Sequence, residues 1–155
     1  MGRIGEFPMA YTQIYYHIVF STKGRIPALS KGRSSELYKY IWGFLKNNNC
    51  FLYRIGGIED HIHILTSLHQ SVALSDLIRD LKTSSNHWIK QEKIFKNFIG
   101  WQDDYGAFTK SHSERDEVIQ YIKNQEVHHK KESSLSEFKR LLTQEGIEWN
   151  EKYLR

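Results

Sequence analysis

The sequence is poor in cysteine and contains no long apolar stretch. Cys50 is the only cysteine among the 155 residues, so no disulfide can form within the chain and a cysteine-rich zinc ribbon is excluded. No apolar run approaches the ~20 residues that a membrane-spanning helix needs, and the N-terminus lacks the apolar segment of a signal peptide. These absences predict a protein of the reducing cytoplasm that does not act at a membrane.

The chain also carries only a small excess of one charge. Lysine and arginine total 22 against 18 aspartate and glutamate residues, which gives a net charge of +4. Such an excess permits a polyanionic partner without requiring one. The length and the hydrophobic fraction of 39% are typical of one globular domain.

No internal repeat or linker divides the sequence. Residues 1–8 resemble expression-vector sequence ahead of a native start at Met9, and we leave them out of the fold prediction. We therefore predict a single domain over residues 9–155.

Hydrophobic periodicity predicts a mixture of strands and helices. Apolar–polar alternation indicates strands over residues 11–21, 50–55 and 61–69, with short pieces at 98–101 and 105–109. Helical spacing indicates helices over residues 34–48, 74–90, 113–131 and 136–144. Gly56 and Gly57 are predicted to form a tight turn or a bulge. This order predicts an α+β fold, in which helices pack on one antiparallel sheet of four to five strands, as in ferredoxin-like and RNA-recognition-like domains.

Two histidines share one face of the predicted strand 61–69. Residues i and i+2 of a strand point to the same side, so His61 and His63 emerge next to each other, opposite Ile62 and Ile64. Neutral imidazole is the commonest nitrogen ligand of divalent metals. The alternative is a pair of strand histidines that face solvent or make ordinary hydrogen bonds, which is the commoner outcome for an isolated motif of this kind.

Tyr121 and Gln125 are one turn apart on the predicted helix 113–131 and share a face with apolar residues. The alternative to a catalytic role is a tyrosine that packs its ring at the edge of the core. Together with two imidazoles, however, a glutamine oxygen makes a three-ligand metal site with positions open for a substrate. A tyrosine nearby could then attack a metal-bound electrophile such as a phosphate ester, if a cation or base assists its phenol, whose ordinary pKa is ~10.

Five separated segments resemble the single-tyrosine HUH transposases of the TnpA type. The segment 56–64 is similar to the metal-binding strand of that family, and 121–130 to its nucleophile helix. The other similar segments are residues 20–25, 81–85 and 101–108.

The resemblance implies an HUH nuclease fold and a dimeric DNA transposase that cuts and rejoins single-stranded DNA at insertion-sequence ends next to subterminal hairpins. Tyr121 would be the nucleophile that forms a 5′-phosphotyrosine. His61, His63 and Gln125 would hold Mg²⁺ or Mn²⁺, and two imidazoles make Mn²⁺ at least as well suited as Mg²⁺. The family also implies that each nucleophile helix completes the metal site of the partner subunit, and we expect residues 106–112 to be a flexible connection that permits this.

Other residues have weaker claims. Tyr105 is the rival nucleophile, although packing or base stacking suits it better. Glu59 and Asp60 are turn residues or partners that orient an imidazole. Residues 128–131 place cations at a helix C-terminus, where the helix dipole favours them whatever the function. DNA phosphates are the predicted partners of five basic residues that would otherwise form a solvated face: Lys23, Arg25, Arg54, Arg79 and Lys82.

Three other functions compete with a mobile-element transposase. A domesticated relative that acts on genomic repeats would have the same chemistry. A non-catalytic RNA-recognition-like module is the second, but the aromatic signature motif of such modules is absent. A zinc hydrolase built on the two histidines would leave Tyr121 and Gln125 without roles.

Overall fold

The computed structural model describes residues 10–154, so the prediction that residues 1–8 derive from a vector lies outside the described residues. Four strands form the sheet: β1 (Tyr15–Ser21), β2 (Leu52–Ile58), β3 (His61–Ser67) and β4 (Gly106–Lys110). The helices are α1 (Ser34–Asn47), α2 (Leu74–Gln91), α3 (Arg115–Lys123), α4 (Gln125–His128) and α5 (Ser134–Gln144). Short 3-10 turns are η1 (Lys23–Arg25), η2 (His112–Glu114) and η3 (Glu151–Tyr153).

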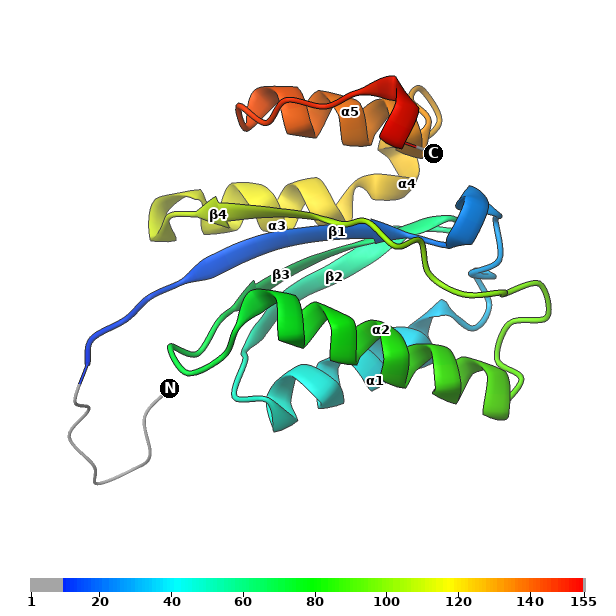
Figure 1. The fold of residues 1–155 in the computed structure, drawn as a ribbon, viewed down its shortest axis with the longest axis horizontal. Helices are drawn as coiled ribbons and strands as arrows, with labels where there is room; N and C mark the ends of the chain where they lie inside the picture. Colours follow the sequence, from blue (N-terminus) through cyan, green and yellow to red (C-terminus); the bar gives the residue numbers. More distant parts are fainter. Residues whose placement is uncertain (1–9, 155) are drawn as a thin grey trace.

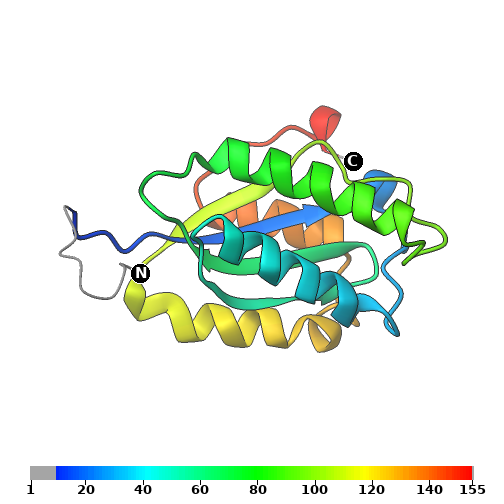
Figure 2. The same cartoon turned by 90° about the horizontal axis from the view of Figure 1, so that it is seen from below.

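The four strands form one antiparallel sheet in the order β2-β3-β1-β4. Helices α1 and α2 cover one face, and α3, α4 and α5 lie on the opposite side (Figures 1 and 2). The predicted α+β architecture is therefore confirmed, with four strands.

The face under α1 and α2 holds the larger apolar core. Ile62 and Ile64 point from β3 into this layer, where they meet Leu37 and Ile41 of α1 and Leu81 of α2. The helical spacing of these residues places one apolar stripe of each helix against the sheet. Thr66, on the same side of β3, is also buried and bonds through its hydroxyl to the backbone oxygen of Phe51.

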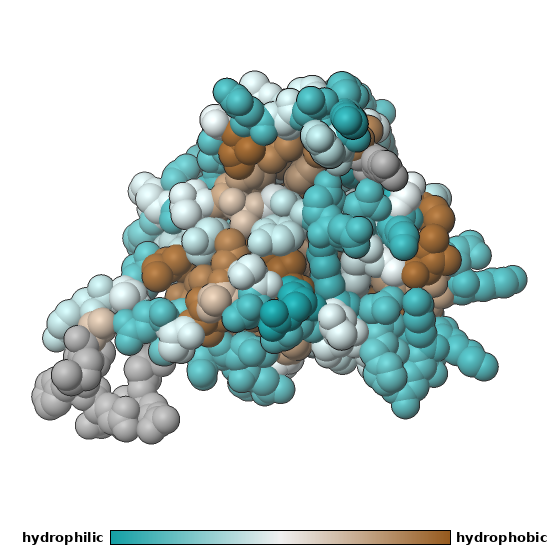
Figure 3. All heavy atoms as spheres, in the orientation of Figure 1, coloured by the Kyte–Doolittle hydropathy of each residue, from teal (hydrophilic) through white to brown (hydrophobic). Residues whose placement is uncertain are grey.

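The opposite face has two smaller apolar clusters. Under α3, Val118 and Ile122 pack on Leu65 of β3. Under α5, Phe138 packs with Phe108 of β4 and other sheet residues. The space-filling view shows apolar residues between α2 and α5 that are bordered by polar ones (Figure 3). Polar side chains occupy the region between the two clusters.

Several predicted boundaries of the sheet were wrong. Gly56 and Gly57 lie inside β2, and the turn to β3 is made by Glu59 and Asp60, while the bulge of β2 lies at its start. Strand β1 starts at Tyr15 rather than at residue 11. The predicted strand piece 98–101 contributes only one bridge, from Trp101 to Thr22.

Residues 106–112 are not the flexible connection that we expected. Residues 106–110 are strand β4, which pairs with β1, and a 3-10 turn follows them. Backbone hydrogen bonds to β1 hold this segment in the sheet, so it offers little freedom for the next helix to move away.

The predicted helix 113–131 is interrupted. Helix α3 ends at Lys123, Asn124 has φ −92° and ψ 15°, and α4 begins at Gln125. No glycine or proline marks the break, but asparagine favours turns because its side chain competes for backbone hydrogen bonds. Helical geometry resumes at Gln125, directly after this one residue.

Within residues 10–154, no helix is both long enough and apolar enough to cross a membrane.

Candidate active site

Strand β3 delivers both histidines to the face that α3, α4 and α5 cover. His61 is 1% exposed and His63 is fully buried. Their rings lie 5.0 Å apart between centroids. The prediction that the two imidazoles share one face of the strand is therefore confirmed. This face points into the protein interior rather than toward solvent.

Glycine in β2 lets α3 lie close to this strand. A Cβ atom at Gly56 would lie 3.0 Å from the backbone oxygen of Ile122 and 3.1 Å from its Cγ2. Gly56 is also the register partner of His63 across the β2–β3 ladder. The lack of a side chain at this position thus allows the helix that carries Tyr121 to approach the histidines.

Helix α4 adds two side chains to the cluster. The Oε1 atom of Gln125 accepts a hydrogen bond from His61 Nε2 at 2.9 Å and lies 3.0 Å from His129 Nε2. Gln125 is 1% exposed. The i, i+4 spacing of Gln125 and His129 brings both onto the face that meets β3.

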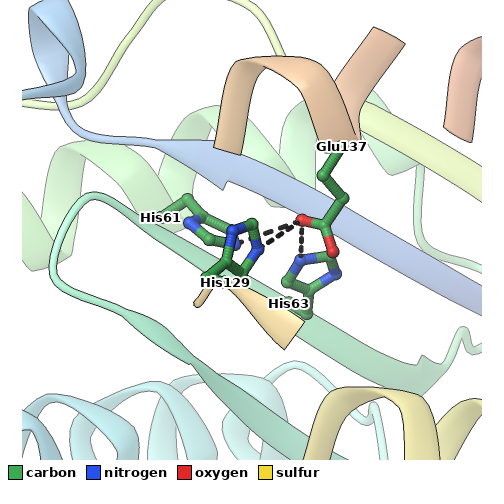
Figure 4. A group of neighbouring side chains, drawn as sticks. All are labelled: His61, His63, His129 and Glu137. Atoms are coloured by element: carbon green, nitrogen blue, oxygen red, sulfur yellow. Dashed lines mark hydrogen bonds and ion pairs between the residues drawn. The ribbon is translucent and has the colours of Figure 1, made fainter. Parts of the chain in front are cut away.

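Helix α5 supplies a carboxylate at the centre of the cluster. Glu137 is fully buried, and its Oε1 atom lies 2.9 Å from His63 Nε2, 3.1 Å from His129 Nε2 and 3.3 Å from His61 Nε2. Its Oε2 atom accepts a hydrogen bond from Gln125 Nε2 at 2.9 Å. Figure 4 shows the carboxylate reaching from α5 to the three imidazoles.

The two strand histidines differ in protonation. Burial lowers the pKa of His61, but its hydrogen bonds to Asp60 and Glu137 outweigh burial and raise the pKa to about 9. His63 has no carboxylate on its second nitrogen, because Nδ1 faces His17 Nε2 at 2.8 Å. Burial therefore dominates and lowers the pKa of His63 to about 4, against the opposing effect of Glu137. The cluster combines a charged and a neutral imidazole.

Asp60 orients His61, as one of the two interpretations of this residue predicted. Its Oδ1 atom lies 2.8 Å from His61 Nδ1, which leaves Nε2 of the imidazole directed at Gln125 and Glu137. The other carboxylate oxygen accepts a hydrogen bond from Ser134 at the start of α5. A carboxylate behind an imidazole fixes the ring orientation of metal-binding histidines in the same way.

Tyr121 points into the same cluster from α3. Its hydroxyl donates a hydrogen bond to Glu137 Oε2, and Nη2 of Arg140 donates to the hydroxyl at 2.9 Å. Its ring lies 5.8 Å from that of His63 between centroids. Burial and the adjacent Glu137 raise the pKa of Tyr121, while Arg140 opposes them. The phenol is therefore neutral in this arrangement.

The donor atoms fit a metal ion. Four residues, His61, His63, His129 and Glu137, offer one ligand atom each within 4.8 Å of one another. Three imidazole nitrogens with one carboxylate oxygen are ordinary ligands of divalent transition metals. A buried group of histidine and glutamate side chains in this protein could therefore hold a metal ion.

The structure brings the four predicted site residues together. Tyr121, His61, His63 and Gln125 all contact Glu137. Gln125 also accepts a hydrogen bond from His61. The rival residue Tyr105 lines a small pocket together with His61, and its ring lies 5.5 Å from the Lys82 ammonium.

The predicted DNA-contacting residues are spread over different surfaces. Lys23, Arg79 and Lys82 line an open groove of about 450 Å³ together with Tyr105. Lys82 donates hydrogen bonds to three backbone oxygens, those of Gln102, Asp103 and Asp104, so its ammonium holds the loop before β4. Arg79 is exposed and forms ion pairs with two acidic residues of its own helix, Asp76 and Asp80.

The other two basic residues lie closer to the histidines. Arg25 donates to Ser134 Oγ at 3.2 Å, and its guanidinium lies over the ring of Phe138. Arg54 lines a cleft of about 590 Å³ that Gln125 and His129 also line. Arg25 also lines a small pocket together with His61. Arg54 and Arg25 therefore both lie on surfaces that lead to the cluster.

Sequence reasoning missed Glu137, His129, Arg140 and His17 as site residues. A signal was present for Glu137, because this acid sits in the inward-facing stripe of α5 with Phe138 and Leu141. An ionisable residue on a buried face needs a partner. For His129, which the sequence indicates only as a cation at a helix end, the i+4 spacing from Gln125 was the available signal.

Comparison with known proteins relates this chain to DNA transposases. The family model described as "Transposase IS200 like" matches residues 10–125. A solved structure of a transposase candidate from Deinococcus radiodurans R1 has a TM-score of 0.58 and 22% identity, covering 79% of this chain and 98% of its own. A REP-associated tyrosine transposase bound to a REP hairpin has a TM-score of 0.59 and 16% identity, covering 81% of this chain and 74% of its own. No curated protein matches the sequence.

The two solved structures show the fold, which is the HUH nuclease fold that the sequence resemblance implied. The family match ends at Gln125, so it includes the two strand histidines, Tyr121 and Gln125. His129 and Glu137 lie beyond it.

Proposed function

Because the chain belongs to the family of IS200-like transposases, we propose that it cuts and rejoins single-stranded DNA at insertion-sequence ends with Tyr121 as the nucleophile. The observation that carries the proposal is the contact of the Tyr121 hydroxyl with Glu137, whose other oxygen lies 2.9 Å from His63. The nucleophile and the histidines proposed as metal ligands thus meet at one buried carboxylate.

The proposed cleavage forms one bond and breaks one. The Tyr121 oxygen bonds to the phosphorus, the bond to the 3′ oxygen breaks, and the products are a 5′-phosphotyrosine and a free 3′-hydroxyl that has gained a proton. The phenol loses its proton as the 3′ oxygen gains one, so the step releases no net proton. Arg140 Nη2, 2.9 Å from the hydroxyl, is placed to stabilise the phenolate. Rejoining is the reverse attack by a 3′-hydroxyl and returns a proton to Tyr121, so no ATP is consumed.

The cofactor we propose is Mg²⁺ or Mn²⁺, held by His61, His63 and Gln125. Their donor atoms belong to the buried cluster, and the chemistry of the donors suits Mn²⁺ at least as well as Mg²⁺. When bound, the cation would polarise the scissile phosphate. Asp60 keeps Nε2 of His61 directed at the cluster whether or not an ion is present.

The proposed substrate is single-stranded DNA with hairpin ends. The likeness of fold to a transposase bound to a REP hairpin supports hairpin recognition. The cleft that Arg54 lines with Gln125 and His129 is the surface we propose for the strand near the cleavage point. Lys23, Arg25, Arg79 and Lys82 stay predictions for contacts farther along the DNA, and the cytoplasmic location stays a prediction as well.

The predicted homodimer with sites completed in trans is a separate question. Tyr121 lies beside His63 of its own chain, and β4 holds the preceding segment in the sheet. This arrangement supports a site completed in cis. Mixing Tyr121→Phe and His63→Ala subunits distinguishes the two, because a trans site would restore about a quarter of the wild-type activity in a randomly exchanged dimer. A cis site would leave the mixture inactive.

A domesticated relative that acts on genomic repeats is the second candidate. The likeness of fold to a REP-associated tyrosine transposase favours it over a non-catalytic binding module or a zinc hydrolase. Cleavage of single-stranded repeats from the host genome, with no cleavage of insertion-sequence ends, would support this candidate.

The decisive experiment traps the covalent intermediate. Single-stranded oligonucleotides with hairpin ends are incubated with the protein and Mn²⁺, and a protein–DNA adduct is sought on a denaturing gel. We expect the adduct for the wild type and for Tyr105→Phe, and none for Tyr121→Phe, which keeps the ring and loses the attacking oxygen. An adduct with Tyr121→Phe would show that another residue is the nucleophile. Hairpin binding without any adduct in the wild type would support a binding module instead.

A further inference from the structure

The buried carboxylate of Glu137 has more partners than a structural role needs. A buried acid is tolerated when one or two hydrogen bonds or an ion pair compensate its charge. Glu137 instead contacts three imidazoles through Oε1, and Tyr121 and Gln125 through Oε2. The three imidazoles, Tyr121 and Gln125 therefore converge on this one residue.

The contacts at Oε1 have the spacing of ligands around one ion. Three imidazole nitrogens lie 2.9–3.3 Å from this oxygen. Ligand atoms at ~2.1 Å from a tetrahedral ion lie roughly 3.4 Å from one another. Hydrogen bonds from His63 and His129 fill the two lone pairs of this oxygen. Nε2 of His61 lies within 3.3 Å of the same oxygen but makes its hydrogen bond to Gln125. A cation between the four atoms would engage all of them.

The contacts at Oε2 are of a different kind. This oxygen accepts hydrogen bonds from the Tyr121 hydroxyl and from Gln125 Nε2, and both donors come from the α3–α4 segment. One carboxylate therefore faces the metal-binding imidazoles with one oxygen and the nucleophile with the other. Helix α5, which carries it, lies beyond the residues that the family model matches.

We propose that Glu137 is a ligand of the divalent cation while it accepts the hydrogen bond from the Tyr121 hydroxyl. Helix α5 would then connect the metal ion to the nucleophile through this one side chain. This inference rests on the proposed metal-dependent function. With His61 and His63 of the proposed site and with His129, it gives three imidazoles and one carboxylate, a set that favours Mn²⁺ over Mg²⁺. In this set Glu137 replaces Gln125 as a ligand, and the amide of Gln125 hydrogen-bonds Glu137 Oε2 and His61. It also implies that metal binding stabilises α5, although no residue of α5 belongs to the histidine motif.

The test measures metal binding rather than cleavage. Mn²⁺ binding to the metal-free protein is followed by calorimetry, and amide hydrogen exchange is followed in α5 with and without Mn²⁺. Glu137→Gln keeps the shape of the side chain and removes the charge. We expect at least a tenfold loss of Mn²⁺ affinity, and loss of the metal-induced protection of Ser134–Gln144 that the wild type shows.

Glu145→Gln is the matched control. It removes one negative charge just after the same helix, where Glu145 pairs with Lys110 far from the cluster, and should bind Mn²⁺ like the wild type. If Glu137→Gln does not fold, Glu137→Asp keeps the charge but withdraws the oxygens by one methylene, and it should show the same losses.

The outcomes separate this inference from the proposed function. Wild-type affinity for Mn²⁺ in either folded Glu137 variant, or an α5 whose exchange does not respond to Mn²⁺ in the wild type, overturns the inference alone. Absence of Mn²⁺ binding in the wild type overturns both the inference and the metal dependence of the proposed function.

Discussion

The two faces of strand β3 are made by alternate residues of one short segment, and both are buried. Ile62 and Ile64 enter the apolar layer under α1 and α2, while His61 and His63 enter the polar cluster under α4 and α5. Apolar burial is non-directional and is worth roughly 25 cal/mol per Å². Buried imidazoles gain nothing of this kind unless each nitrogen finds a partner.

The difference lies in how each face tolerates change. The apolar face depends on volume, so a smaller side chain costs stability and leaves the chemistry in place. The polar face depends on a set of mutual contacts, since Glu137 alone serves His61, His63 and His129. We expect a change there to impair the proposed function before it disrupts the fold. Substitutions on each face test this contrast.

The largest effect is expected for His63→Ala. The change removes a proposed metal ligand and one partner each from Glu137 and His17. We expect cleavage to fall by about 100-fold or more, since even indirect disturbance of a metal site costs 10–100-fold. The measurement is adduct formation on single-stranded DNA at saturating Mn²⁺. Full activity of the wild type in EDTA would show that the histidines have a structural role, and the two faces would then not differ in function.

Ile64→Ala is the matched change on the other face. Ile64 is fully buried, so truncation should lower the free energy of unfolding by about 2–5 kcal/mol. Urea unfolding measures this loss. Adduct formation per folded molecule should stay within about twofold of the wild type at low temperature. A loss of activity as deep as that of His63→Ala would show that the two faces are not separable.

The pH dependence of stability should be set by the polar face. The pKa of His61 is raised to about 9, so its contribution is complete below pH 6.5, the ordinary value, and is lost as the pH rises through 9. The pKa of His63 is lowered to about 4, so its contribution is complete above pH 6.5 and is lost as the pH falls toward 4. We expect the unfolding free energy in EDTA to be highest near pH 6.5.

Urea unfolding from pH 4.5 to 9 measures this profile. In Glu137→Gln the decline on the alkaline side should be shallower, because Glu137 is one of the groups that raise the pKa of His61. A wild-type stability that rises steadily up to pH 9 would contradict the assignment of a charged His61.

The smallest effect is expected for single surface cations. Arg54→Gln should weaken binding of single-stranded DNA several-fold and reduce the salt dependence by about one counterion, because Arg54 lines the cleft that reaches Gln125 and His129. Arg79→Gln should change affinity less than twofold, since Arg79 already pairs with Asp76 and Asp80. Fluorescence anisotropy at two salt concentrations compares the DNA affinities of the two variants. Equal losses of affinity would indicate that the single-stranded DNA contacts the Arg79 surface as well as the Arg54 cleft.

The sheet, and the side of it on which each β3 residue lies, could be predicted from the sequence. Both follow from the alternation of residues along a short strand. The placement of His61 and His63 opposite Ile62 and Ile64 follows from the period of two that any strand imposes. The i, i+4 pair of Tyr121 and Gln125 was also predictable and survives the break at Asn124 because the chain resumes helical geometry at once.

The carboxylate at the centre of the site was not predictable from local pattern. Glu137 reaches His63 only because α5 folds back over the sheet, and no periodicity specifies where a helix docks. The same holds for the interruption at Asn124, which no glycine or proline marks in the sequence. Boundaries and long-range partners are set by tertiary packing, which short windows of sequence do not contain.

The distance along the chain between β3 and α5 has a consequence during synthesis. His63 and Glu137 are 74 residues apart in sequence, and Tyr121 lies between them. A nascent polypeptide in which the histidines and the tyrosine have already been synthesised still lacks the carboxylate on which they converge. The ribosome therefore adds the carboxylate of the proposed catalytic centre after the histidines and the tyrosine. An enzyme that breaks DNA would in this way stay inert until α5 has been synthesised.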